Sequence, residues 1–263
     1  MFANSRINLP QLNNQLKIIG IKISGISDYY DCYSLVKSKN CKAPLYITVN
    51  NVHTVITAIK NDYYKLIINN SWLSLPDGKP LSIVAKLKGE KNIKRIFGPT
   101  FFENTLDWGQ TDKIKHYLFG SSTETLNKMI AVIEKKYPSA IISGCFSPPF
   151  REFTSEENEL FLKQMNESEA DIFWIGLGAP KQEIWMYENY KKLDHGVMVV
   201  IGAGFDYLAG NTKHAPEWMK NASLEWLYRL IQEPGRLWKR YLVTNTLFII
   251  LSILELLGLR KFD

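Results

Sequence analysis

Short apolar runs alternate along the chain with longer stretches in which apolar residues recur every three or four positions. The short runs have the length and residue types of strands, and eight are predicted: Leu16–Ser24, Leu45–Val49, Trp72–Leu75, Lys94–Gly98, His116–Gly120, Ala140–Cys145, Ile172–Gly176 and Val197–Ile201. The longer stretches predict helices, most clearly at Val52–Lys60, Thr123–Lys136, Ser155–Gln164 and Lys181–Tyr190. Because the two kinds of element alternate, we expect an α/β fold with a mainly parallel sheet flanked by helices.

The pattern changes after about Trp218. Apolar residues at Leu224, Leu227, Tyr228 and Ile231 mark one face of a helix, and Pro234-Gly235 ends it. A further helix can start there, because proline is well tolerated in a first turn. The sequence therefore predicts an α/β domain over residues 1–217 and a helical appendage over residues 218–263.

The segment from Leu242 to Gly258 is mostly apolar. Its roughly 17 residues are at the short limit of what spans a bilayer. Asn245 and Glu255 within it, and basic residues on both sides, favour a helix that lies in the membrane interface. A buried helix of the α/β fold and a true membrane span are also possible structures for this segment.

On such a helix, one apolar stripe is expected to face the membrane, away from Asn245, Ser252 and Glu255. The stripe consists of Val243, Leu247, Ile250, Leu254 and Leu257.

Composition narrows the class of protein. Of 263 residues, 46% are hydrophobic and 13% aromatic, which excludes a disordered, collagen-like or disulfide-built chain. Three scattered cysteines indicate a reducing compartment, and the first residues do not follow the pattern of a secretory signal. A net charge of +6 permits a phosphate-rich partner or an anionic membrane surface, and no nucleic-acid partner is expected.

Two common kinds of site are not supported by motifs. The four histidines are dispersed and no Asp-x-Asp occurs, so no metal site is expected, and cationic side chains would have to bind any diphosphate. Gly176-x-Gly178 and Gly202-x-Gly204 do not complete the G-x-G-x-x-G fingerprint. A dinucleotide-dependent oxidoreductase is therefore unsupported.

Polar residues follow two of the predicted strands. Thr48 and Asn50 close one strand, and Asp77 follows the next on a Pro-Asp-Gly turn. Asp77 suits a general base that takes a proton from a sugar hydroxyl, although its position also suits an N-cap of the next helix.

A basic set follows in the appendage. It fits either a clamp on a diphosphate or a surface for water and lipid headgroups, and it consists of Arg229, Arg236, Lys239 and Arg240.

Three long motifs together resemble the WecG/TagA/CpsF family of bacterial glycosyltransferases. They are Gly176–Trp185 (GLGAPKQEIW), Gly202–Asp206 (GAGFD) with Ala209-Gly210, and Leu224–Pro234 (LEWLYRLIQEP). The resemblance runs from about Ile19 to Tyr241. It implies a Rossmann-like fold of the GT-E type with a C-terminal appendage that associates with membranes.

The resemblance also implies an activity. This is the inverting transfer of a sugar, without metal or other cofactor, from a UDP-sugar to a polyprenyl-diphosphate-linked acceptor. The sugar would be a hexose, an N-acetylhexosamine or its uronate, and the product a bacterial cell-surface polysaccharide. The protein would act at the cytoplasmic face of the bacterial membrane, peripherally bound. Its oligomeric state stays open, a homo-oligomer included.

Residue by residue, the resemblance makes Asp77 the catalytic base. Thr48 and Asn50 match a Thr-x-Asn that lines the pocket, Arg95 matches an active-site arginine, and Gln182 matches the glutamine of Pro-Lys-Gln-Glu. In the appendage, the arginines that close over the site are matched by Arg229 and Arg236, with Lys239 or Arg240 as the third.

Several positions depart from the family pattern. They are Val49, Thr100, His214 and Gly235, and because they surround the expected pocket, the donor sugar stays open. Two different functions also remain open: a nucleotide-sugar epimerase or dehydrogenase, and a non-catalytic, membrane-associated scaffold that binds nucleotide sugars. The missing dinucleotide fingerprint disfavours the first function, and the joint presence of Asp77, Thr48, Asn50 and Gln182 disfavours the second.

Overall fold

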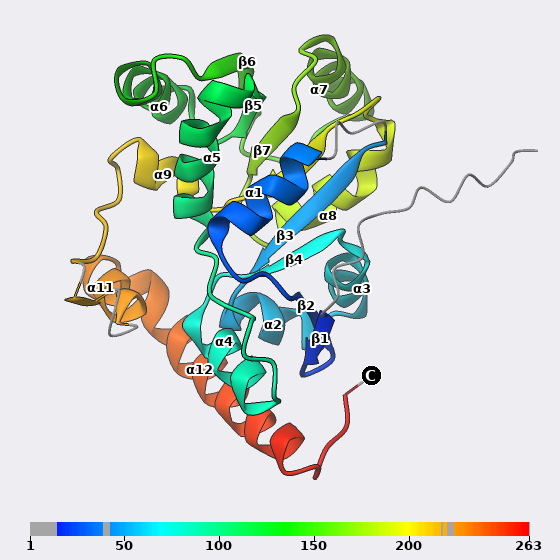
Figure 1. Ribbon diagram of the computed structural model, residues 1–263, viewed down its shortest axis with the longest axis vertical. Coiled ribbons are helices and arrows are strands. Elements are labelled where there is room, and N and C mark those ends of the chain that lie inside the picture. Colours follow the sequence, from blue (N-terminus) through cyan, green and yellow to red (C-terminus); the bar gives the residue numbers. More distant parts are fainter. Residues whose placement is uncertain (1–14, 39–42, 217, 220–223, 263) are drawn as a thin grey trace, which may run out of the picture.

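The computed structural model describes residues 15–38, 43–216, 218–219 and 224–262. A central sheet of six parallel strands has the order β4-β3-β8-β7-β5-β6 (Figure 1). Its strands are β3 (Leu45–Asn50), β4 (Leu73–Pro76), β5 (Lys115–Gly120), β6 (Ile141–Phe146), β7 (Ile172–Gly176) and β8 (Val197–Val200). The predicted α/β fold with a mainly parallel, helix-flanked sheet is thereby confirmed.

Helices cover both faces of this sheet, because neighbouring residues of a strand point to opposite sides. In β8, Val197 and Val199 pack in the cluster that also holds side chains of α1 (Tyr29–Ser38), α5 (Gly98–Asp112), α6 (Thr123–Lys136) and α9 (Gly204–Leu208). Met198 and Val200 pack in a second cluster, with α3 (Asp62–Asn70), α7 (Ser155–Glu167) and α8 (Lys181–Asn189). The continuous apolar runs of the sequence are thus strands buried on both faces.

Two strand predictions are wrong. Lys94–Gly98 is not a strand, and α5 begins at Gly98 with proline in its first turn. Leu16–Ser24 is not one strand but a hairpin of β1 (Gln15–Ile18) and β2 (Ile21–Ser24). Ile19 and Gly20 form its turn with φ values of 50° and 72°, as a two-residue turn of this twist requires.

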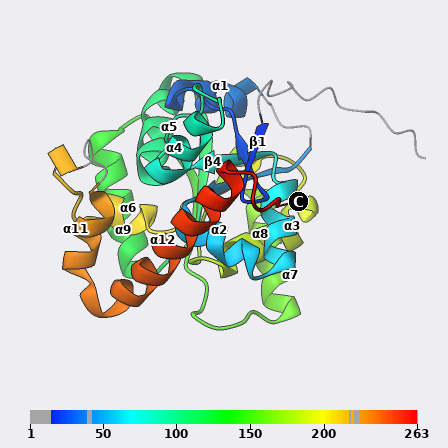
Figure 2. The ribbon, with the colours of Figure 1, turned by 90° about the horizontal axis from the view of Figure 1, so that it is seen from below.

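A third apolar cluster lies between this hairpin, α2 (Val52–Ile59), α4 (Lys79–Leu87) and the C-terminal helix α12 (Pro234–Leu256). Seen from below, α12 crosses the underside of the molecule beside α2 (Figure 2). Phe248 and Leu251 of α12 are buried in the cluster. The shorter helix α11 (Glu225–Gln232) precedes α12.

A carboxylate fastens the end of α12 to the domain. Glu255 accepts hydrogen bonds from the main-chain nitrogen of Ile19, at 3.1 Å to each oxygen, and forms an ion pair with Lys88 at 3.0 Å. Glu255 therefore satisfies a main-chain donor in the hairpin turn and holds α12 against the end of α4.

The predicted membrane stripe on α12 is wrong in part. Leu247 and Leu254 pack against the third cluster, whereas Val243, Ile250 and Leu257 are exposed. Ser252 and Glu255 turn toward the domain. The sequence pattern could not settle this, because α12 has apolar residues around most of its circumference.

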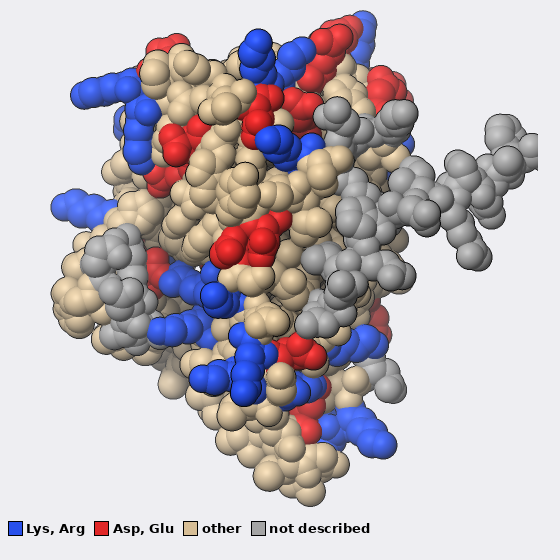
Figure 3. Space-filling model, viewed as in Figure 1, with Lys and Arg blue, Asp and Glu red and all other residues tan. Residues whose placement is uncertain are grey.

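The opposite face of α12 is apolar and exposed, which excludes a fully buried helix. Among the described residues, α12 is the helix with a segment, Leu237–Leu256, long and apolar enough to cross a membrane. The exposed apolar side chains of this face include Leu242, Val243 and Ile250. The lower tip of the molecule, where α12 ends, carries mostly uncharged side chains, and Lys and Arg gather above it (Figure 3).

Candidate active site

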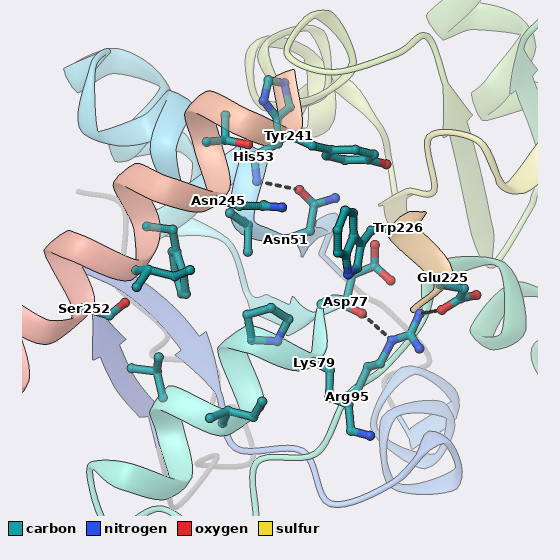
Figure 4. Close-up of a pocket in the computed structure, with 18 of the residues that line it drawn as sticks. Asn51, His53, Asp77, Lys79, Arg95, Glu225, Trp226, Tyr241, Asn245 and Ser252 are labelled. Atoms are coloured by element: carbon teal, nitrogen blue, oxygen red, sulfur yellow. Dashed lines mark hydrogen bonds and ion pairs between the residues drawn. The ribbon is translucent and has the colours of Figure 1, made fainter. Parts of the chain in front are cut away.

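A cavity of about 530 Å³ opens where β3 and β4 end and continues between α4 and α12 (Figure 4). Asn51 and Asp77, which follow these two strands, lie at this end of it. The carboxyl ends of strands in an open α/β sheet are the usual place for a ligand. The appendage closes the cavity from the other side through α11 and α12.

Asp77 is hydrogen-bonded to the end of β3 and to the start of α5. Its main-chain nitrogen donates to the carbonyl oxygen of Asn50 at 2.8 Å, and the nitrogen of Gly98 lies 3.4 Å from Oδ1. The N-cap residue of α4 is Gly78, and no side chain caps that helix. Asp77 is therefore not a helix cap, and its carboxylate is available to the cavity.

The surroundings raise the pKa of the Asp77 carboxyl above its ordinary value. Burial is the main cause, and the negative charge of Glu225 acts in the same direction. The positive charge of Arg95 and hydrogen bonds from Gly98 and Asn51 oppose the rise. A carboxylate with a raised pKa is a stronger proton acceptor than an ordinary one.

Arg95 connects Asp77 to the appendage. Its Nε donates to the main-chain carbonyl oxygen of Asp77 at 2.7 Å, and its guanidinium forms an ion pair with Glu225, the first residue of α11. The guanidinium also lies 4.7 Å from the ring centre of Phe97. Oε1 of Glu225 is buried and has no hydrogen-bond partner among the described residues.

Two arginines of the appendage line the same cavity. Arg229 comes from α11 and lies 5.8 Å from the ring centre of Tyr207, and Arg240 comes from α12. Burial, and secondarily the charge of Arg240, lower the pKa of His53 to about 4, so His53 is neutral at pH 7. With Lys79 and Arg95, the cavity thus offers four cationic side chains to an anionic ligand.

The structure does not place the other two basic residues singled out from the appendage, Lys239 and Arg236, at the cavity. Lys239 does not line the cavity; it is exposed, and its Nζ lies 5.6 Å from the ring centre of Trp238. Arg236 lies in the first turn of α12, and its side chain is outside what the structure describes. Of Lys239 and Arg240, the structure therefore brings Arg240 to the cavity.

Thr48 and Asn50 do not line this cavity and are fully buried. Nδ2 of Asn50 donates to Oγ1 of Thr48 at 2.9 Å and to Oγ of Ser74 at 2.8 Å. These bonds join the ends of β3 and β4. Since the main chain of Asn50 also accepts the bond from Asp77, the pair fixes the turn that carries the carboxylate.

Gln182 is also buried and does not line the cavity. It lies in the first turn of α8, where Oε1 accepts from the nitrogen of Gly178 at 3.1 Å and Nε2 donates to Glu183 at 2.9 Å. These bonds order the glycine-containing loop before α8.

Several lining residues were not singled out from the sequence. They are Asn51, His53, Lys79, Tyr207, Glu225, Trp226 and Tyr241. Glu225 and Trp226 stand within the Leu224–Pro234 motif, which is the one signal that pointed to them. Within the described ranges, no three His, Cys, Asp or Glu side chains cluster so as to hold a metal ion.

Comparison with known proteins agrees with the resemblance of the three sequence motifs. The model of the family described as "Glycosyl transferase WecG/TagA/CpsF family" matches residues 16–262. An N-acetylglucosaminyldiphosphoundecaprenol N-acetyl-beta-D-mannosaminyltransferase of Bacillus subtilis (strain 168) is 29% identical over 236 residues, 89% of this chain and 85% of the relative. A protein of the same name from Bacillus spizizenii is 26% identical over 229 residues, 87% of this chain and 85% of the relative.

Proposed function

The chain belongs to the WecG/TagA/CpsF family of glycosyl transferases, and we propose that it transfers a sugar from a UDP-sugar to a polyprenyl-diphosphate-linked sugar. The names of its relatives support this acceptor, because both act on N-acetylglucosaminyldiphosphoundecaprenol. They also favour an N-acetylhexosamine as the transferred sugar. The product belongs to the synthesis of a bacterial cell-surface polysaccharide.

One observation carries the proposal: a carboxylate with a raised pKa shares a cavity with several guanidinium groups. Asp77 supplies the carboxylate, and Arg95, Arg229 and Arg240 supply the positive charge. A glycosyl transfer from a nucleoside diphosphate needs both, since a hydroxyl must lose a proton while a diphosphate gains charge.

The chemistry is a single displacement at the anomeric carbon. Asp77 accepts the proton of the acceptor hydroxyl as its oxygen forms the new glycosidic bond. On the opposite face, the bond between the anomeric carbon and the diphosphate oxygen breaks, and UDP keeps the electron pair. The configuration is inverted, and the proton remains on Asp77 until water removes it.

The cations stabilise the leaving group. Arg240 and Arg229 come from the appendage, and Arg95 is held between Asp77 and Glu225. Forked guanidinium donors match diphosphate oxygens well, and such bonds strengthen as charge develops. In this scheme the arginines do the work of a divalent cation, so no metal and no other cofactor takes part.

The transferase works at the inner face of the bacterial cytoplasmic membrane, bound peripherally. The exposed apolar face of α12 would enter the interface, and basic residues nearby would attract anionic lipids. A lipid-linked acceptor is then delivered directly to the cavity, because α12 forms one of its walls.

A panel assay tests the proposal. The full-length protein is incubated with individual UDP-sugars and a short-chain acceptor in which N-acetylglucosamine is linked through diphosphate to the lipid. Acceptor-dependent UDP release, with a product heavier by one sugar, is expected for one donor and unchanged in excess EDTA. Asp77→Asn serves as the matched control. A folded protein that binds UDP-sugars but turns none over would be the scaffold instead.

Two further outcomes of the assay would contradict the proposal. NAD binding with conversion of the UDP-sugar in the absence of acceptor would identify an epimerase or dehydrogenase. Loss of turnover in EDTA, restored by Mg²⁺ or Mn²⁺, would contradict the cationic site.

A further inference from the structure

The cavity extends well beyond its charged end. Its lining residues on α12 follow one helical face in alternating steps of three and one: Leu237, Arg240, Tyr241, Thr244, Asn245, Phe248, Ile249, Ser252, Ile253 and Leu256. From the first to the last of them, the helical rise spans about 28 Å. The cavity is therefore a groove along α12 rather than a pocket around Asp77 alone.

The opposite wall is one face of α4. Lys79, Pro80, Ile83, Val84 and Leu87 line the groove, again in steps of one and three. Because α4 starts two residues after Asp77, its first turn lies at the charged end and its last turn lies at the far end. Figure 4 shows Asp77, Arg95 and Glu225 together at one end and Ser252 at the other.

Both walls change from polar to apolar in the same direction. On α12 the lining residues after Asn245 are apolar except Ser252, and on α4 those after Lys79 are apolar. At the far end Ile83 is 51% exposed and Ile253 is 49% exposed, although both line the groove. Apolar side chains that face a shared hollow and remain in water gain free energy when an apolar ligand covers them.

We propose that this groove between α4 and α12 binds the polyprenyl chain of the acceptor, in the part nearest to its diphosphate. The inference rests on the proposed function and adds a subsite to it. The diphosphate of the acceptor shares the cationic end of the groove with the diphosphate of UDP, and the acceptor sugar reaches Asp77. The first isoprene units lie along Ile83, Leu87 and Ile253.

The distribution of charge selects this occupant. The ligand must carry negative charge at one end and a long apolar chain directly behind it, because the cations lie at one end of the groove and apolar side chains at the other. These apolar side chains are Ile83, Leu87, Ile249, Ile253 and Leu256. A polyprenyl diphosphate has this order of groups. A second protein helix would put no comparable charge beside Arg95, Arg229 and Arg240.

Farnesyl diphosphate and inorganic diphosphate are the probes. Isothermal titration with the full-length protein, in buffer free of lipid and detergent, measures the affinity for each. The farnesyl chain should improve binding at least tenfold over inorganic diphosphate, because it buries apolar surface of the groove.

Two isoleucines of α12 provide a matched pair of variants. Ile253 lines the groove and Ile250 does not, yet both are 49% exposed. Ile253→Asn, and Ile83→Asn on the opposite wall, should reduce the preference for farnesyl diphosphate by about tenfold. Ile250→Asn should keep it within twofold. Unchanged affinity for inorganic diphosphate would show that each variant is folded with its charged end intact.

Two results would overturn the groove: no preference for the farnesyl chain in the unaltered protein, or an equal loss in Ile250→Asn and Ile253→Asn. The second result would place the chain on the outer face of α12. Turnover of a short-chain acceptor is measured in parallel. If the protein turns over the acceptor but binds farnesyl diphosphate no better than inorganic diphosphate, only the groove proposal is refuted. If it prefers farnesyl diphosphate but turns over no UDP-sugar, only the proposed function is refuted.

Discussion

Arg95 donates from Nε to the main-chain carbonyl oxygen of Asp77 at 2.7 Å. The rest of its guanidinium pairs with Glu225 of the appendage. The turn that carries the proposed base is therefore tied to α11 through one side chain. Since α11 and α12 also contribute cations to the cavity, the position of the appendage and the geometry of the site are coupled.

Asp77→Asn is expected to abolish transfer while UDP binding persists. The amide has the shape of the carboxylate but accepts no proton, so the rate should fall by roughly 10²–10⁴-fold. Single-turnover rates and UDP titrations measure the two effects. A variant that keeps more than about a tenth of the rate would contradict the role of general base.

Glu225→Gln is expected to move the acidic limb of the pH profile to lower pH. The charge of Glu225 helps to raise the pKa of Asp77, so its removal lowers that pKa and leaves the base ionised in more acidic solution. The other charged or ionisable groups that act with Asp77 are Arg95, Tyr29 and Tyr207, and they are unchanged.

The measurement for Glu225→Gln is kcat/KM as a function of pH. The maximal rate should fall as well, because Arg95 loses the ion pair that orients it. A lower rate with an unmoved acidic limb would mean that Glu225 acts through Arg95 alone.

Arg229→Ala and Arg240→Ala should each lower kcat by roughly 10–100-fold, the value of a charge-assisted hydrogen bond of about 1.5–3 kcal/mol. Lys239→Ala is the control, because Lys239 is a neighbouring cation outside the cavity. Steady-state kinetics with a short-chain acceptor separates the three variants. A loss in Lys239→Ala as large as in Arg240→Ala would show a general effect of basic charge.

Val243→Asp combined with Ile250→Asp should weaken binding to anionic vesicles at unchanged thermal stability. Both side chains are exposed on the outer face of α12, so the substitutions cost little in the folded state and oppose insertion into lipid. Co-sedimentation with vesicles measures binding. Unchanged sedimentation would mean that this face does not enter the membrane.

Truncation after Tyr241 is a poor test of membrane binding. It removes Phe248 and Leu251 from the third apolar cluster as well as the outer face of α12. Loss of these buried side chains should cost several kcal/mol and destabilise the domain. The point variants avoid this effect.

Glu255→Ala is expected to destabilise the protein by about 1–3 kcal/mol. It leaves the main-chain nitrogen of Ile19 without its acceptor and removes the partner of Lys88. In a chain of this size, that corresponds to a fall in Tm of about 2–4 °C per kcal/mol. Thermal unfolding monitored by circular dichroism measures it, with Leu259→Ala as an exposed control nearby. An unchanged Tm would show that apolar packing alone holds α12.

The sequence predicted the central sheet well, because buried parallel strands are continuous apolar runs that need no knowledge of their neighbours. Capping is equally local: Thr154 and Glu157, three residues apart, form a capping box at the start of α7. The strand predicted at Lys94–Gly98 is absent for the opposite reason, because whether this segment forms a strand depends on the segments beside it. It has strand-like residues, yet its main-chain nitrogens donate to separate segments, Lys94 to the carbonyl oxygen of Ile26 and Ile96 to that of Pro76, so no ladder forms.

By itself, the sequence determined that Asp77 stands at the end of a strand and that the appendage is basic and then apolar. Only the tertiary structure decided that Arg240 rather than Lys239 reaches the cavity, and that Glu225 pairs with Arg95. It also decided that α4 and α12 form one groove. The physical reason is that an apolar helix such as α12 has several faces that could pack against the domain. Which face packs is determined by polar contacts with distant parts of the chain, such as those of Glu255 with Ile19 and Lys88.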